Sequence, residues 1–190
     1  TKLINKYPKY AGRTVESLVA DWDAAADYGT SVHEELERWI KDGFEPSDIK
    51  AINGKDWLQH YKLKSDIDIL SEVIVYSKEL SIAGTVDILA KDNSTGLYEI
   101  IDWKTSKKIE MVSYGQKMGT HEITKNIMDC NFYHYSLQLS LYRYILETYY
   151  GLKIHNQLIA QLHDDGVNAH VAPYMKDEII AMLDYKMELS

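Results

Sequence analysis

The chain has 190 residues, of which 45% are hydrophobic and 26% charged, a composition typical of globular proteins and not of disordered or fibrous ones. Its 29 acidic residues outnumber its 21 basic ones, and the net charge of −8 argues against nucleic-acid binding by overall positive charge. No apolar run approaches the roughly 18 residues that span a bilayer, and a single cysteine, Cys130, excludes a disulfide framework and a four-cysteine iron–sulfur site. We therefore expect an intracellular, cytoplasmic protein that does not enter a membrane.

The N-terminal third is predicted to be helical. Apolar residues recur at helical spacing over residues 14–43, with Gly29 as an interruption and Gly43 as a stop signal. A second, short helix is predicted over residues 56–63. Residues 1–65 are thus expected to form the helical part of a single domain that spans residues 1–190.

Residues 66–190 are expected to form a sheet core with helices. Stretches rich in Val, Ile, Tyr and Thr predict three successive strands, over residues 72–77, 82–91 and 97–105. A helix over residues 129–150, capped by Asp129 or Asn131, precedes two strands over residues 154–163 and 167–173 and a closing helix from Met175. The order α-βββ-α-ββ-α predicts an α/β (α+β) fold with a mixed β-sheet flanked by helices.

The second predicted hairpin brings two carboxylates together. If residues 93–96 form a four-residue turn, Asp87 lies directly across from Asp102, and Lys104 shares that face because it lies two residues further along. The opposite face is expected to be apolar, made of Ile82, Val86, Ile88 and Ala90. Facing carboxylates repel one another, and a divalent cation that prefers oxygen ligands, Mg²⁺ or Mn²⁺, is the simplest remedy. The alternative is that Asp87 is exposed and Lys104 merely neutralises Asp102.

Four short motifs follow one another along the chain. They are Gly-x-x-x-His at residues 29–33, Gly-x-x-Asp at residues 84–87, Asp-x-Lys-Thr at residues 102–105 and Gln-x-x-x-Tyr at residues 138–142. In this order they resemble the PD-(D/E)XK nuclease superfamily, specifically its RecB-like branch with phage and mitochondrial genome maintenance exonuclease-like relatives. The resemblance covers residues 29 to 142 and implies a restriction-endonuclease-like core.

The resemblance also implies roles for individual residues. It makes His33, Asp87 and Asp102 metal ligands, with the backbone carbonyl of Trp103 beside them, and it makes Lys104 the catalytic lysine. Glu72 at the start of the first strand is a candidate ligand for a second ion, as an acidic residue is in some relatives. Its alternative is a charge at the edge of the sheet.

Three helical residues of these motifs also make physical sense on their own. Gln138 and Tyr142 are one turn apart, so both project from one helix face and could hydrogen-bond a phosphate or an active-site water. His33 lies on the apolar stripe of the first helix. For each of them the alternative is an ordinary packing or surface role.

A basic segment follows the Asp-x-Lys-Thr motif. Residues 103–125 contain five lysines and two glutamates, a net charge of +3 in an otherwise acidic chain. We therefore expect this segment to arch over the site and guide a strand of nucleic acid, with contacts from Lys107, Lys108, Lys117 and Lys125. The alternative is a solvated loop.

Taken together, these features predict a divalent-metal-dependent DNA nuclease that hydrolyses phosphodiester bonds, an exonuclease acting on DNA ends or single strands. The expected cofactor is Mg²⁺ or Mn²⁺, as one or two ions, without an iron–sulfur cluster. The expected partners are DNA and replication or recombination proteins, in the host cytoplasm if the protein is phage-encoded. Two alternatives stay open, a cap-snatching-like RNA endonuclease and a non-catalytic nucleic-acid-binding module of the same fold.

Overall fold

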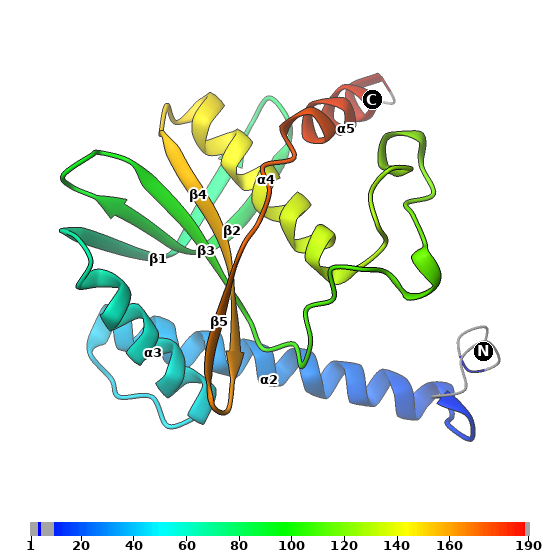
Figure 1. Cartoon of the computed structure of the whole chain (residues 1–190), viewed down its shortest axis with the longest axis horizontal. Helices are drawn as coiled ribbons and strands as arrows, with labels where there is room; N and C mark the ends of the chain where they lie inside the picture. The colour runs from blue at the N-terminus through cyan, green and yellow to red at the C-terminus, as the bar shows by residue number, and fades with distance from the viewer. Residues whose placement is uncertain (1–3, 5–9, 189–190) are drawn as a thin grey trace.

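The structure is a computed structural model that describes residue 4 and residues 10–188. Its helices and strands follow one another in the order expected from the sequence (Figure 1). The helices are α2 (Val15–Asp42), α3 (Ile49–Lys62), α4 (Asn131–Tyr149) and α5 (Lys176–Glu188), and the short 3₁₀ turns η2 (Tyr114–Gln116) and η3 (Glu122–Thr124) lie between β3 and α4. The strands are β1 (Ile67–Ser77), β2 (Ile82–Asp92), β3 (Tyr98–Lys104), β4 (Ile154–His163) and β5 (Gly166–Val171).

The strands form one mixed sheet in the order β1-β2-β3-β4-β5. Strands β3 and β4 pair in parallel, whereas the other neighbouring pairs are antiparallel. A parallel pair needs a long crossover connection, which here contains the basic segment and α4. The predicted α/β class with a mixed, helix-flanked sheet is therefore confirmed.

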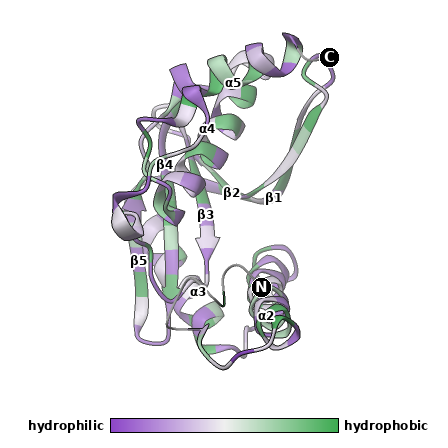
Figure 2. Cartoon of the chain, turned by 90° about the vertical axis from the view of Figure 1, so that its right-hand side faces the viewer, coloured by the Kyte–Doolittle hydropathy of each residue, from purple (hydrophilic) through white to green (hydrophobic). Residues whose placement is uncertain are grey.

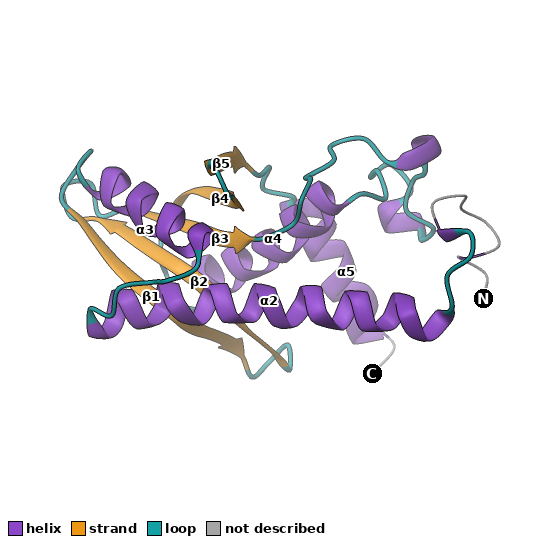
Figure 3. Cartoon of the chain, turned by 90° about the horizontal axis from the view of Figure 1, so that it is seen from below, coloured by secondary structure: helices purple, strands orange, loops and turns teal. Residues whose placement is uncertain are grey.

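Helices cover both faces of the sheet, so the chain has two apolar cores (Figures 2 and 3). Helices α2 and α3 pack on one face through Leu36 and Leu58, which contact Ile101 and Trp103 of β3 in the same cluster. Helices α4 and α5 pack on the other face, where Leu139 shares a cluster with residues of β2, β3 and β4. The sheet is thus buried on both faces, and a polar residue on its inner strands needs a partner.

Helix α2 has nearly the predicted bounds, but it continues through Gly29, where an interruption was predicted. The Thr14 side chain accepts a hydrogen bond from the backbone N–H of Ser17, and Gly43 ends the helix in the left-handed conformation at φ 75°. Gly29 does not interrupt the helix, because a single glycine lowers helix stability by only about 1 kcal/mol. Its small size instead admits Thr105, whose Oγ1 lies 3.2 Å from where a Cβ would stand.

Three other predicted boundaries were wrong. Helix α3 begins at Ile49, well before residue 56, because the Asp48 side chain caps it by accepting a hydrogen bond from the N–H of Lys50. Strand β1 begins at Ile67 instead of residue 72. Helix α4 has Cys130 at its N-cap, and the side chain of Asn131 bonds instead to the backbone of Glu110 and Lys108.

Candidate metal centre

The β2–β3 hairpin has the register that the sequence predicted. Asp92 N–H donates to the carbonyl of Leu97 at 2.9 Å, so residues 93–96 form the four-residue turn. The strand pairing then runs from Lys91↔Tyr98 to Ile88↔Ile101. Continued by one residue, the same register sets Asp87 opposite Asp102. At this point the backbone N–H of Trp103 donates a hydrogen bond to Asp87 Oδ2 at 2.7 Å. The side-chain carboxylate thus replaces the backbone carbonyl that would accept this bond in a regular sheet.

The prediction that Ile82, Val86, Ile88 and Ala90 share one apolar face of β2 was wrong, because the alternation of side chains along the strand breaks at Asp87. Ile88 belongs to the core under α2 and α3, whereas Val86 belongs to the core under α4 and α5. Strand β1 is distorted at the matching position. Its pairs with β2 run through Ser71↔Ile88 and Val73↔Val86, so Glu72 lies opposite Asp87, and Glu72 has a left-handed φ of 52°. This break turns Asp87 toward α2.

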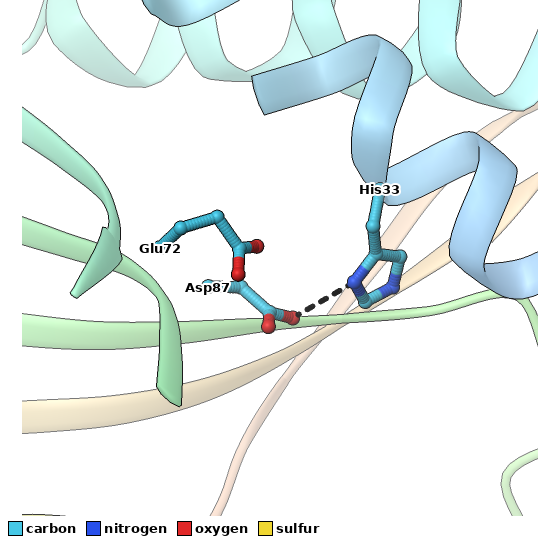
Figure 4. A group of neighbouring side chains, drawn as sticks. All are labelled: His33, Glu72 and Asp87. Carbon is cyan, nitrogen blue, oxygen red and sulfur yellow. Dashed lines mark ion pairs between the residues drawn. The ribbon is translucent and has the colours of Figure 1, made fainter. Parts of the chain in front are cut away.

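His33 of α2 meets these two carboxylates over the sheet (Figure 4). One ligand atom each from His33, Glu72 and Asp87 can be chosen so that all three lie within 4.8 Å of one another. The imidazole Nδ1 is 3.5 Å from Asp87 Oδ2. The three residues come from α2, β1 and β2 and belong to segments far apart in the sequence. A group of two carboxylates and an imidazole is a donor set that first-row divalent ions bind.

Asp102 and Lys104 form a second group beside the first. Lys104 Nζ lies 2.5 Å from Asp102 Oδ2, and only 5% of the Asp102 side chain is exposed. The two residues are separated by Trp103, whose side chain is buried in the α2–α3 core. Asp102 was expected among the ligands with His33 and Asp87. In the structure it is paired with Lys104, and its charge acts on both His33 and Asp87.

Burial raises the pKa of both aspartates. Burial is the main cause for Asp87, whose pKa rises to about 6 although Lys104 and the Trp103 N–H oppose the rise. The pKa of Asp102 also rises to about 6, first through burial and then through repulsion by Asp87. For Lys104, burial favours the neutral amine, but the attraction of Asp102 and Asp87 raises its pKa above the ordinary value. The lysine is therefore charged, and the two aspartates are held in a site that resists their negative charge.

The other two residues of the group have shifted pKa values as well. Burial and the positive charge of Lys104 lower the pKa of His33, so the imidazole is neutral at pH 7 and able to donate a lone pair to an ion. Burial and the nearby Glu37 raise the pKa of Glu72. With Glu72, Asp87 and Asp102 ionised and Lys104 charged, the centre carries a net charge of −2. A divalent cation would neutralise that charge, so the residues present fit one.

Two of the sequence motifs contact each other directly. A Cβ at Gly84 would lie 2.4 Å from Cε1 of Tyr142, so only glycine leaves room for this ring. The hydroxyl of Tyr142 accepts a hydrogen bond from Gln138 Nε2 at 3.1 Å. Tyr142 thus packs α4 against β2 three residues from Asp87, and this contact explains why glycine occupies the first position of the Gly-x-x-Asp motif.

The four lysines of the basic segment that were expected to contact nucleic acid are exposed, which fits a solvated loop equally well. They are Lys107, Lys108, Lys117 and Lys125. Lys125 forms an ion pair with Glu122. The segment leaves the end of β3 beside the centre, and Figures 1 and 3 show it at the same end of the molecule as the N-terminal half of α2.

Sequence reasoning missed one neighbour of the centre, Tyr135 of α4. The Lys104 ammonium lies over its ring, 4.9 Å from the centroid. No motif contains Tyr135, and in a chain with 15 tyrosines nothing in the local pattern singles it out. Only the packing of α4 across β3 could have identified it.

Comparison with protein-family models and with curated proteins finds no match for this sequence. Among the helices that the structure describes, none combines the length and the hydropathy needed to cross a membrane.

Proposed function

We propose that this protein is a divalent-metal-dependent DNA nuclease that hydrolyses phosphodiester bonds, and that it belongs to the RecB-like branch of the PD-(D/E)XK superfamily. The proposed cofactor is Mg²⁺ or Mn²⁺. The proposed substrate is DNA with free ends or single-stranded regions, and replication or recombination proteins are the proposed partners.

One observation carries the proposal. Three carboxylates, a neutral imidazole and one charged lysine converge at the break in β2 with an uncompensated charge of −2, in a site where burial makes that charge costly. A purely structural cluster would be balanced by further cations or replaced by apolar residues. The order of the four motifs along the chain resembles that of the PD-(D/E)XK nucleases, and this resemblance points to phosphodiester hydrolysis as the reaction.

His33, Glu72 and Asp87 would hold the ion. Asp102 lies outside this group and is paired with Lys104 through Oδ2, so its other oxygen would be the one to reach an ion. When bound, the ion supplies charge neutralisation at the scissile phosphate and lowers the pKa of a bound water. Lys104 supplies a fixed positive charge for the negative charge that develops on phosphorus-bound oxygens. Its ion pair with Asp102 holds it in place before substrate arrives.

The strand of DNA would reach the centre along the basic segment. Lys107 and Lys108 are exposed directly after the end of β3, where their charges can meet backbone phosphates. Because the rest of the chain is acidic, this contact should be local and sensitive to salt.

The test is incubation of the protein with end-labelled linear DNA and with closed circular DNA, in Mn²⁺ and in chelator. We expect cleavage of linear DNA only with the ion, abolished by Lys104→Ala. Lys55→Ala is the matched control, because Lys55 also forms a 2.5 Å ion pair, with Glu45, at a similar side-chain exposure of 16% against 18% for Lys104.

Each other outcome has a definite meaning. Cleavage of a matched RNA oligonucleotide but not of DNA would favour the RNA endonuclease. Mn²⁺-independent binding of DNA without cleavage would favour the binding module. Equal cutting of closed circles would refute the dependence on ends, and full activity of Lys104→Ala would refute the proposed chemistry.

A further inference from the structure

Lys104 has a second close neighbour besides Asp102, the aromatic ring of Tyr135. Its ammonium lies over the ring of Tyr135, 4.9 Å from the centroid, while Asp102 Oδ2 is 2.5 Å away. The side chain of Lys104 is 18% exposed, so both contacts are shielded from bulk water. A cation over an aromatic face in such a setting is attracted more strongly than on the surface.

The ring of Tyr135 is itself held in place. Its hydroxyl is 3.0 Å from Ser106 Oγ, two residues beyond Lys104. The carbonyl of Ser106 accepts a hydrogen bond from Gln161 Nε2 at 2.8 Å, and the buried Gln161 pairs with Lys104 across the parallel strands β3 and β4. Gln161 Oε1 lies 3.3 Å from His170 Nε2 of β5. This chain of contacts connects the ring to the sheet.

Lysine has a flexible stem of four carbons, so a catalytic lysine must be restrained to act at one position. Asp102 alone is a poor restraint, because an ion at the centre would compete with Lys104 for the charge of that carboxylate. The face of Tyr135 carries no formal charge and would keep its attraction for the ammonium throughout. The ion pair with Asp102 would therefore restrain Lys104 before an ion binds, and the ring of Tyr135 would restrain it afterwards.

We propose that Tyr135 is a positioning residue for Lys104, with its ring face holding the ammonium at the centre when Asp102 turns its charge to a bound ion. This inference rests on the proposed nuclease function, since it concerns the residue that acts on the phosphate. Among the described residues, Tyr135 forms no hydrogen bond with the proposed ion ligands His33, Glu72 and Asp87, and in this assignment it does not contact the substrate.

The test compares two substitutions at this position. Tyr135→Leu keeps apolar bulk but removes the ring, and we expect kcat to fall about tenfold, the scale of a shielded cation–π contact. Tyr135→Phe keeps the ring, so this variant should retain most of the kcat of the parent protein. In both variants KM for DNA and the affinity for Mn²⁺ should stay as in the parent protein. Tyr133→Leu is the matched control, because Tyr133 lies on the same helix and stacks edge-on against Phe132.

A second readout does not depend on activity. The ε-CH₂ protons of Lys104 over the ring should resonate upfield of ordinary lysines in NMR spectra, and Tyr135→Leu should abolish that shift. If the parent cleaves DNA but Tyr135→Leu has unchanged kcat, or if Tyr135→Phe is as impaired as Tyr135→Leu, the inference is overturned while the nuclease function stands. If the upfield shift is found but the parent does not cleave, the nuclease function is overturned, and with it the positioning role.

Discussion

Replacing Asp87 by asparagine should stabilise the metal-free protein while it removes catalysis. Asparagine has nearly the shape of a protonated aspartate and can still accept the hydrogen bond from the N–H of Trp103. The pKa of Asp87 rises from 3.8 to about 6 in the folded protein, chiefly through burial. At pH 8 this rise lowers the unfolding free energy of the parent by about 3 kcal/mol, and the variant avoids this loss. For a chain of this length the melting temperature should rise by about 6 to 12 °C.

The sign of the pH dependence follows from the direction of the pKa change. A carboxyl group with a raised pKa in the folded state contributes its stability below its unfolded pKa and loses it as the pH rises through the folded pKa. The parent should therefore lose stability between about pH 4 and pH 6. Asp87→Asn should lose less, because only Asp102 and Glu72 then remain as carboxyl groups of the centre with a raised pKa. Thermal unfolding in chelator at pH 4 and pH 8 measures the difference, which should vanish at the lower pH.

A control on the same strand should behave in the opposite way. Hydrogen bonds from Ser94 lower the pKa of Asp92 to about 2, so its charge stabilises the fold at neutral pH. Asp92→Asn should therefore lower the melting temperature at pH 8. Adding Mn²⁺ should stabilise the parent by mass action and do much less for Asp87→Asn. A lower melting temperature for Asp87→Asn at pH 8 in chelator would refute the reasoning, since the carboxylate would then stabilise the fold through its hydrogen bond from the N–H of Trp103.

Three further predictions follow from the geometry of the centre. His33→Ala should weaken Mn²⁺ binding about tenfold or more by calorimetry, whereas His134→Ala, which removes another histidine paired with an aspartate, should not. Gly84→Ala should lower the unfolding free energy by about 1 to 3 kcal/mol in denaturant titration, and adding Tyr142→Leu should recover most of that loss because the clashing ring atoms are gone. Mn²⁺ affinity of the parent should fall as the pH drops below about 6, because protons then compete for Asp87.

Local signals in the sequence were enough for the fold and for half of the centre. The turn at residues 93–96 fixed the register of β2 and β3 from Lys91↔Tyr98 to Ile88↔Ile101, and this register continued by one residue sets Asp87 opposite Asp102. Thr14 and Gly43 marked both ends of α2 because a capping hydroxyl and a left-handed glycine act within a few residues. These features depend on neighbours in the chain, so one sequence suffices to predict them.

The rest of the centre depends on tertiary packing. The break at Asp87 arises where β2 changes from one apolar core to the other, and strict alternation of side chains cannot predict it. Glu72 can be read equally as an edge charge, because the sequence pattern places it at the start of β1 and no local signal fixes the register of β1 with β2. Whether His33 and Asp102 bind an ion stays a prediction, as do the roles of Gln138 and Tyr142.

The arrangement of β1, β2 and β3 also has a consequence for the path of folding. These strands form an antiparallel meander joined by short turns, so Glu72, Asp87 and Asp102 are brought together by the contacts that close the smallest loops. Pairing β3 with β4 requires closing the whole crossover from Lys104 to Ile154, which costs more chain entropy. We therefore expect the three carboxylates to meet before the crossover is closed. Their repulsion would then raise the folding barrier as well as destabilise the native state, so refolding in chelator should slow as the pH rises.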